Sequence, residues 1–218
     1  AIPIMTGAPL PEGTHYIVPH ERCLISGTRL RPRLIDQNSR MSLRQGLNFR
    51  KGETYLLAGT TITPLHVAFL AMDGKSDVKV FSKPCLAVVS TGDELSVVIE
   101  KNLQKGHIRN SHPSLIYSAL LRYGIVTQSE IVSDDPVLLK ERFAYYINSD
   151  EDVIITTGGL GKGVRDFTRT VLKETGCFPL FEGIAAWPVG TFSAYETNGK
   201  IVFAFPGGLV SVLLLTKF

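Results

Sequence analysis

The sequence predicts an α/β fold in which a mostly parallel sheet is flanked by helices, with a smaller β-rich part at the N-terminus. Two observations predict this fold. From residue 85 onward, apolar runs typical of buried strands alternate with helical patterns, an order that builds parallel sheets. Before residue 50, short alternating segments with frequent Pro and Gly replace any helical period, which indicates short strands.

The composition is that of a globular chain. With 218 residues and 44% hydrophobic content, the chain is long enough for one large domain and a smaller part. A net charge of +3 favours neither a nucleic acid nor a membrane as partner. No signal peptide opens the chain, and no apolar run reaches the roughly 18 residues that span a bilayer. Three widely spaced cysteines without a CxxC pair argue against a disulfide framework or a zinc site, so we expect a reducing, cytoplasmic setting.

Three parts follow one another along the chain. Residues 1–48 are predicted to form a partial β-rich domain, residues 49–63 a connector, and residues 64–218 the main α/β domain. The first helix of that domain has Thr63 as N-cap and Pro64 at its first position. Basic residues concentrate before it, either as a solvated surface or as a rim for an anionic ligand or acidic partner. They are Arg29, Arg31, Arg33, Arg40, Arg44, Arg50 and Lys51.

Beyond residue 84 strands and helices alternate. The predicted strands are CLAVVST (85–91), IVTQSEIV (125–132), DVIITT (152–157) and KIVFAF (200–205). The predicted helices are SLIYSALLRY (114–123), PVLLKERFAYYI (136–147) and DFTRTVLKET (166–175), and VSVLLL (210–215) is predicted to be a buried helix.

The segment TTGGLGKGVRD, residues 156–166 and hereafter the glycine loop, joins the third strand to a helix. Its glycines allow backbone N–H groups to face an anion such as a phosphate, and Asp166 would place a carboxylate at the helix start. The alternative is that Asp166 caps the helix and the glycines only form a tight turn. The spacing matches neither GxGxxG nor a P-loop, which argues against Rossmann and kinase-like interpretations.

Acidic residues also follow the predicted strands. Because carboxyl ends of parallel strands meet at one edge of a sheet, these acids and the glycine loop should share one crevice. Singly, each acid is better explained as a cap or a solvated loop group, but together with a phosphate loop they favour a bridging Mg²⁺. The acids are Asp93, Glu94, Asp134, Asp135 and Asp166.

Several motifs resemble those of the MoeA family, the molybdopterin molybdenumtransferases, which include the E domains of gephyrin and its plant counterpart. They are IMTGAPLPEG, RKGE, STGDEL, GHIRNS, SDDP, TTGGLGKGVRDFT and FPGGLVS, in the family's order and spacing. TTGG followed by RD also resembles MogA, the adenylyltransferase whose fold the main MoeA domain shares.

The resemblance implies a transferase of molybdenum cofactor biosynthesis. Such an enzyme inserts molybdate into adenylylated molybdopterin with Mg²⁺ and releases AMP. The resemblance also implies a homodimer in which the β-rich part of one subunit faces the MogA-like domain of the other. A MogA-like adenylyltransferase or a molybdoenzyme is an expected partner. No counterpart of the family's C-terminal β domain is expected in these residues, which look like a fragment.

The resemblance further implies a set of site residues. Glu94, Asp134 and Asp166 match acids expected to act in catalysis and to bind the metal. The expected ligand-binding residues are Thr6, Gly7, Thr91, Gly92, Asp93, Asn110, Ser111, Gly158, Gly159, Gly161, Lys162, Pro206, Gly207 and Ser211.

The sequence departs from the family at some of these motifs. Thr54 replaces the acid of GED, and Trp187 begins the stretch that replaces the lysine-bearing KPGKP loop. Lys162 either partly replaces the lost cations or faces solvent. Trp187 either stacks on a pterin or is packed, and His112 is expected to be a solvated loop group. These losses keep open a catalytically impaired paralogue that only binds molybdopterin or a protein partner. A MogA-like or CinA-like nucleotide hydrolase is disfavoured, because IMTGAPLPEG belongs to neither family.

Overall fold

The computed structural model describes residues 1–33 and 41–217, which form two units, Ala1–Lys79 and Val80–Phe218. The predicted basic residue Arg40 lies outside the described residues, as does Phe218 at the end of the predicted main domain.

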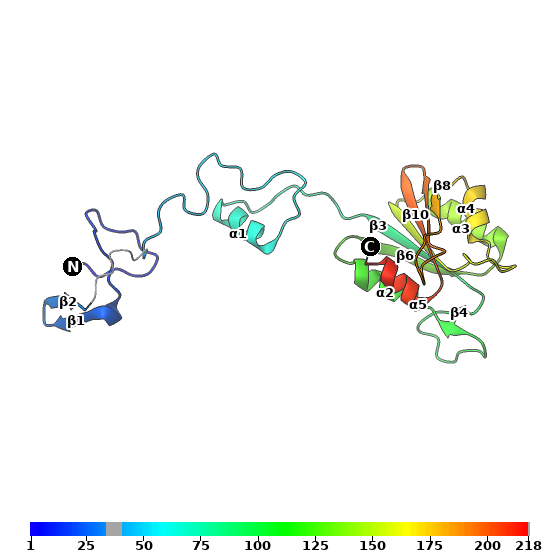
Figure 1. Ribbon diagram of the computed structural model, residues 1–218, viewed down its shortest axis with the longest axis horizontal. Helices are drawn as coiled ribbons and strands as arrows, with labels where there is room; N and C mark the ends of the chain where they lie inside the picture. The colour runs from blue at the N-terminus through cyan, green and yellow to red at the C-terminus, as the bar shows by residue number, and fades with distance from the viewer. Residues whose placement is uncertain (34–40, 218) are drawn as a thin grey trace. The chain divides into compact units, whose positions relative to one another are not determined.

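The described residues of the first unit contain a small antiparallel β pair, a short 3-10 helix and one α-helix (Figure 1). The short helix η1 (His20–Arg22) precedes strands β1 (Cys23–Ser26) and β2 (Arg29–Pro32), so the predicted short strands are present. Helix α1 (Pro64–Met72) begins at Thr63, whose hydroxyl accepts a hydrogen bond from the His66 amide.

Helix α1 groups with the first unit, whereas the sequence placed it at the start of the main domain. Phe69 of the helix contacts Phe49 and Tyr55, and their ring centroids lie 5.9 and 6.2 Å from that of Phe69. No residue of α1 is buried. The aromatic contacts therefore tie α1 to the residues before it.

The second unit is built on a six-stranded sheet with the order β6-β3-β7-β10-β9-β8. The strands are β3 (Cys85–Thr91), β6 (Ile125–Val132), β7 (Val153–Thr157), β8 (Phe178–Glu182), β9 (Ser193–Thr197) and β10 (Lys200–Phe205). Strands β6, β3, β7 and β10 run parallel, and β9 is antiparallel to both of its neighbours. The predicted fold class, a mostly parallel sheet flanked by helices, is confirmed.

Strands β8 and β9 were not predicted from the sequence. A signal for β9 was present, because Asn198 and Gly199 form the two-residue turn between β9 and β10, both with positive φ. Asn-Gly between apolar segments is a strong hairpin signal. A further short parallel pair, β4 (Leu95–Ser96) and β5 (Ile108–Arg109), lies outside the main sheet.

Two helices cover each face of the sheet (Figure 1). Helices α3 (Pro136–Ile147) and α4 (Thr168–Glu174) pack on one face, and α2 (His112–Leu120) and α5 (Leu209–Leu215) on the other. Because side chains alternate along a strand, each of the parallel strands β3, β6, β7 and β10 supplies residues to both cores. In the described residues no helix is long and apolar enough to cross a membrane.

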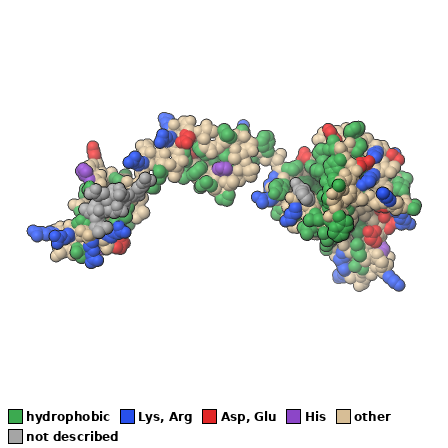
Figure 2. All heavy atoms as spheres, in the orientation of Figure 1, with side chains coloured by type: hydrophobic (Ala, Val, Ile, Leu, Met, Phe, Trp, Pro, Cys, Tyr) green, Lys and Arg blue, Asp and Glu red, His purple; other side chains and the backbone are tan. Residues whose placement is uncertain are grey.

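Helix α5 is half-buried, which corrects the prediction of a buried helix. Val212 and Leu215 face the core, but Val210 and Leu213 are 62% and 45% exposed. A helix lying on one face of a sheet buries only one stripe of its surface. Figure 2 shows hydrophobic side chains gathered at the surface over α5 and α2.

Candidate functional site

A pocket of about 700 Å³ lies at the carboxyl ends of the four parallel strands. The segments that follow β3, β6, β7 and β10 all line it, together with the start of α2. The predicted crevice at one edge of the sheet is therefore present. It contains both the glycine loop and acidic side chains.

Twelve of the predicted site residues line this pocket. They are Thr91, Gly92, Glu94, Asn110, Ser111, Asp134, Gly158, Gly159, Gly161, Asp166, Pro206 and Gly207. The structure thus brings together residues that are more than 100 positions apart in the sequence.

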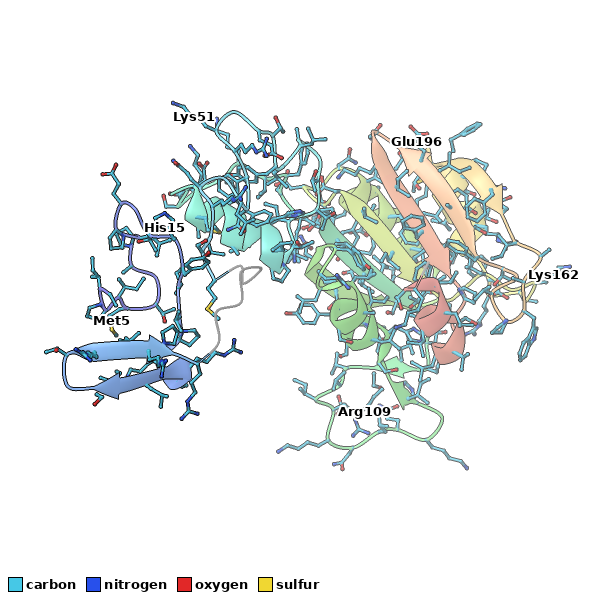
Figure 3. The ribbon with its side chains drawn as sticks, turned by 60° about the vertical axis from the view of Figure 1, so that its left-hand side comes forward. Met5, His15, Lys51, Arg109, Lys162 and Glu196 are labelled. Atoms are coloured by element: carbon cyan, nitrogen blue, oxygen red, sulfur yellow. The ribbon has the colours of Figure 1, made fainter. Side chains whose placement is uncertain are left out.

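The other five predicted site residues do not line the pocket. Lys162 is exposed and extends away from the sheet (Figure 3), so it supplies no cation to the pocket. Ser211 is buried and donates a hydrogen bond to the Pro188 carbonyl at 3.0 Å. Asp93 binds Arg165 beside the pocket. Thr6 and Gly7 are exposed residues of the first unit, and their ligand contacts remain predictions.

The first two glycines of the loop are required by backbone geometry. Gly158 and Gly159 have φ angles of +99° and +64°. A Cβ on Gly158 would lie 2.6 Å from the Thr91 carbonyl oxygen, and one on Gly159 would lie 2.3 Å from the Thr168 hydroxyl. The loop therefore packs directly against the end of β3 and the first residue of α4, with no room for side chains at these positions.

Asp166 closes the glycine loop on itself. Its Oδ2 accepts a hydrogen bond from the Gly163 amide at 2.6 Å. Helix α4 begins only at Thr168, with the half-buried Phe167 as N-cap residue packed against the core. The prediction that Asp166 stands at the helix start is thus corrected. Its carboxylate shapes the loop by the same kind of short-range bond that forms Asx turns.

Two acids from neighbouring strand ends hold each other in place. The Asp134 amide donates to the Asp93 carboxylate at 3.1 Å, and the Asp93 amide donates to the Asp134 carboxylate at 3.4 Å. Burial raises the pKa of Asp134, and the negative charges of Asp93 and Glu94 raise it further. The adjacent Asp135 faces elsewhere and caps α3 by accepting from the Val137 amide at 2.8 Å.

The fit of Mg²⁺ to this site rests on its carboxylates. In the described part of the chain no three His, Cys, Asp or Glu side chains form a group that could hold a metal ion, so Glu94, Asp134 and Asp166 make no closed cage. Mg²⁺ is commonly held by one or two carboxylates, with waters and substrate phosphates completing its shell. Glu94 and Asp134 fit this arrangement, because their crowded negative charges favour a cation. Asp166 already shares one oxygen with its own loop.

His112 is a pocket residue, which corrects its prediction as a solvated loop group. Only 9% of its surface is exposed, and its Nδ1 lies 3.0 Å from the Thr157 hydroxyl at the end of β7. Burial lowers the pKa of the imidazole and favours its neutral form. The contact joins residues 45 positions apart, and only its place directly after the Asn110–Ser111 turn could have suggested it.

Trp187 has neither of its predicted roles in this structure. Its side chain is 94% exposed, so it is not packed, and it does not line the pocket. The residue lies in the connection between β8 and β9.

Protein-family models match both parts of the chain. One described as a probable molybdopterin binding domain matches residues 87–217, which include every residue of the pocket. A second, described as the MoeA N-terminal region (domain I and II), matches residues 1–74. The chain belongs to the MoeA family.

Named relatives of this MoeA-family chain agree with the assignment. It is 31% identical over 207 residues to a molybdopterin molybdenumtransferase of Staphylococcus epidermidis, covering 95% of this chain and 49% of the relative. It is 28% identical to a molybdopterin molybdenumtransferase of Synechococcus elongatus, and the match covers 100% of this chain and 55% of that relative. A solved structure of the molybdopterin biosynthesis MoeA protein of Pyrococcus horikoshii matches with a TM-score of 0.68 and 26% identity, over 90% of this chain and 49% of the other. The chain spans about half the length of these relatives.

Proposed function

We propose that the pocket binds adenylylated molybdopterin, and that the protein catalyses Mg²⁺-dependent insertion of molybdate with release of AMP. The proposal rests on one observation. The glycine loop and the carboxylates line a single pocket of about 700 Å³, and that pocket lies entirely within the stretch that matches a molybdopterin binding domain. A volume of this size suits a ligand of nucleotide dimensions.

The glycine loop would bind a phosphate group through its backbone. Among the described residues, no protein acceptor bonds the amides of Gly159, Leu160 and Gly161, which leaves three donors at the pocket wall. Consecutive free amides form an anion-binding nest. Arg109 and Arg165 also line the pocket and would add positive charge beside a phosphate.

Two acids of the pocket would hold the metal ion. Glu94 and Asp134 are the residues that would bind Mg²⁺. When bound, Mg²⁺ supplies Lewis-acid polarisation of the phosphate linkage. Asp93 would keep Asp134 in position through their two backbone hydrogen bonds, and Asp166 would keep the loop amides aimed at the anion.

The alternative is a paralogue that binds molybdopterin or a protein partner without turnover. The outward position of Lys162 favours it, because no lysine lines the pocket to replace those of the family's KPGKP loop. The homodimer and the adenylyltransferase or molybdoenzyme partner remain proposals that rest on the resemblance. The cytoplasmic setting remains a proposal that rests on the cysteine pattern.

The deciding experiment is to mix the full-length protein with adenylylated molybdopterin, Mg²⁺ and molybdate, and to follow AMP release. We expect release that requires both Mg²⁺ and molybdate. Tight binding without AMP release would favour the binding-only paralogue. Failure to bind the pterin at all would reject the enzyme and would leave only a paralogue that binds a protein partner.

The two cations of the glycine loop, Arg165 and Lys162, distinguish the effect of charge in the pocket from that of charge at the surface. Arg165→Gln should weaken AMP binding about 10-fold, because a charge-assisted phosphate contact is lost. Its ion pair with Asp93 is largely exposed, with side-chain exposures of 72% and 47%. The substitution should therefore change the free energy of unfolding by less than about 1 kcal/mol. Isothermal titration with AMP and urea unfolding measure the two effects.

Lys162→Gln is the matched control, because Lys162 has the same charge and lies three residues away outside the pocket. It should leave AMP affinity unchanged. An equal loss of AMP affinity in Arg165→Gln and Lys162→Gln would mean that AMP responds only to the overall positive charge of the loop, and not to a contact with Arg165.

A further inference from the structure

His112 is a buried polar side chain that the proposed chemistry leaves without a role. It lies at the start of α2, lines the pocket and is 9% exposed. The resemblance to the family assigned functions to the two residues before it but none to His112. A histidine with so little exposed surface at a pocket wall has either a structural role or a ligand to contact.

The hydrogen bonds around His112 define which ring atom is available. The Thr157 hydroxyl donates to the Ser90 hydroxyl at 3.2 Å, and His112 Nδ1 lies 3.0 Å from the same Thr157 oxygen. Since Thr157 has only one hydroxyl proton, Nδ1 carries the proton of the neutral ring and donates it to Thr157. The Nε2 atom is then a hydrogen-bond acceptor.

His112 is one of the residues that line the pocket. In the described part of the chain no protein group bonds Nε2. The backbone around the residue is fixed, because the His112 amide donates to the Asn110 side chain at 3.3 Å and Pro113 follows at the helix start. The strand residue Thr157 and the helix start thus orient the ring from two sides. A preset acceptor at a concave wall is a device for recognising one donor of a ligand.

We propose that His112 is a ligand-contacting residue whose Nε2 accepts a hydrogen bond from an N–H group of the heterocycle bound in the pocket. This inference rests on the proposed function, which supplies two such heterocycles, the pterin and the adenine. Both carry N–H donors, so they share the required chemistry. Molybdopterin and AMP, added separately, distinguish which of them His112 contacts.

Two substitutions separate the two ring nitrogens. In His112→Asn, the amide replaces Nδ1 and keeps the bond to Thr157, but nothing reaches the position of Nε2. In His112→Gln, the longer side chain places its oxygen near that position. We expect His112→Asn to weaken binding of one of the two probes about 10-fold, because the ligand N–H is left without a partner. His112→Gln should recover most of this loss.

The melting temperature distinguishes a ligand contact from a structural role. If the hydrogen bond to Thr157 is kept, His112→Asn should melt within about 3 °C of the wild type, whereas a structural role predicts a larger decrease. His107→Asn is the matched control, because His107 binds the Ser96 hydroxyl at 3.3 Å and does not line the pocket. It should leave binding of both probes unchanged. In ring-¹⁵N-labelled protein, the Nε2 resonance of His112 should shift when the contacted probe is added.

The outcomes distinguish this inference from the proposed function. If the wild type binds the probes, while His112→Asn binds them equally well and the Nε2 resonance does not move, the ligand contact is overturned and the proposed function stands. If the wild type binds neither molybdopterin nor AMP, both are overturned. If the Asn and Gln variants lose the same amount of affinity for the probes and both melt at a lower temperature, His112 has a structural role alone.

Discussion

Gly158→Ala should destabilise the second unit by about 3 kcal/mol and abolish ligand binding. Gly158 has a φ of +99°, which L-residues rarely adopt. Its new Cβ would lie 2.6 Å from the carbonyl oxygen of Thr91. That oxygen belongs to the backbone at the end of β3, where Ser90 is paired with Thr157 of β7. Relief of the clash therefore requires the glycine loop to leave the sheet edge.

The control for this prediction is Gly176→Ala. Gly176 has a similar φ of +87°, but a Cβ added at this position would enter open space. The substitution should cost only the backbone strain of about 1 kcal/mol. Urea unfolding of the full-length protein measures both variants, and AMP titration measures the pocket. Equal destabilisation of the two variants would show that the close approach of the loop to β3 does not matter.

Asp134→Asn should lower AMP release about 100-fold while leaving the fold intact. The substitution removes one negative charge from the proposed metal site. The Asn side-chain oxygen can still accept the hydrogen bond that the Asp93 amide donates to Asp134. The measurement is the rate of AMP release from adenylylated molybdopterin at saturating Mg²⁺ and molybdate.

The effect of this change on stability has a definite sign. Burial and the neighbouring charges of Asp93 and Glu94 raise the pKa of Asp134. The Asp134 carboxyl is therefore more readily protonated in the folded protein than in the unfolded chain. Ionisation above that pKa therefore opposes folding. The neutral Asn variant should be as stable as the wild type at pH 7, or slightly more stable.

Asp135→Asn is the matched control for Asp134→Asn. The two acids are adjacent, but Asp135 caps α3 and does not line the pocket. Asn is as good an N-cap as Asp, so neither stability nor AMP release should change much. A comparable loss of AMP release in both variants would remove Asp134 from the proposed metal site.

Pattern and spacing were sufficient to predict the frame of the second unit. The apolar runs at 85–91, 125–132, 152–157 and 200–205 correspond to strands β3, β6, β7 and β10. Alternation with helices makes such strands parallel, so their carboxyl ends meet at one edge. Most predicted site residues line the pocket for this reason.

Loop conformation was harder to predict than strand position. Lys162 and Asp166 belong to the same glycine loop, yet Lys162 points outward and Asp166 binds back to the Gly163 amide. Which side chains face the pocket depends on the positive φ angles of Gly158 and Gly159. A Cβ at either glycine would clash with Thr91 or Thr168, and no local pattern reveals this close approach.

The amino-acid sequence by itself determined the α/β class, the four parallel strands and the motifs at one edge of the sheet. These follow from periodicity and from the fixed direction of parallel strands, which are local properties of the chain. Only the tertiary structure decided that His112 enters the pocket, that Lys162 leaves it and that Asp166 closes its own loop. The reason is that buried polar side chains are oriented by partners far away in sequence, as Thr157 orients His112 across 45 residues.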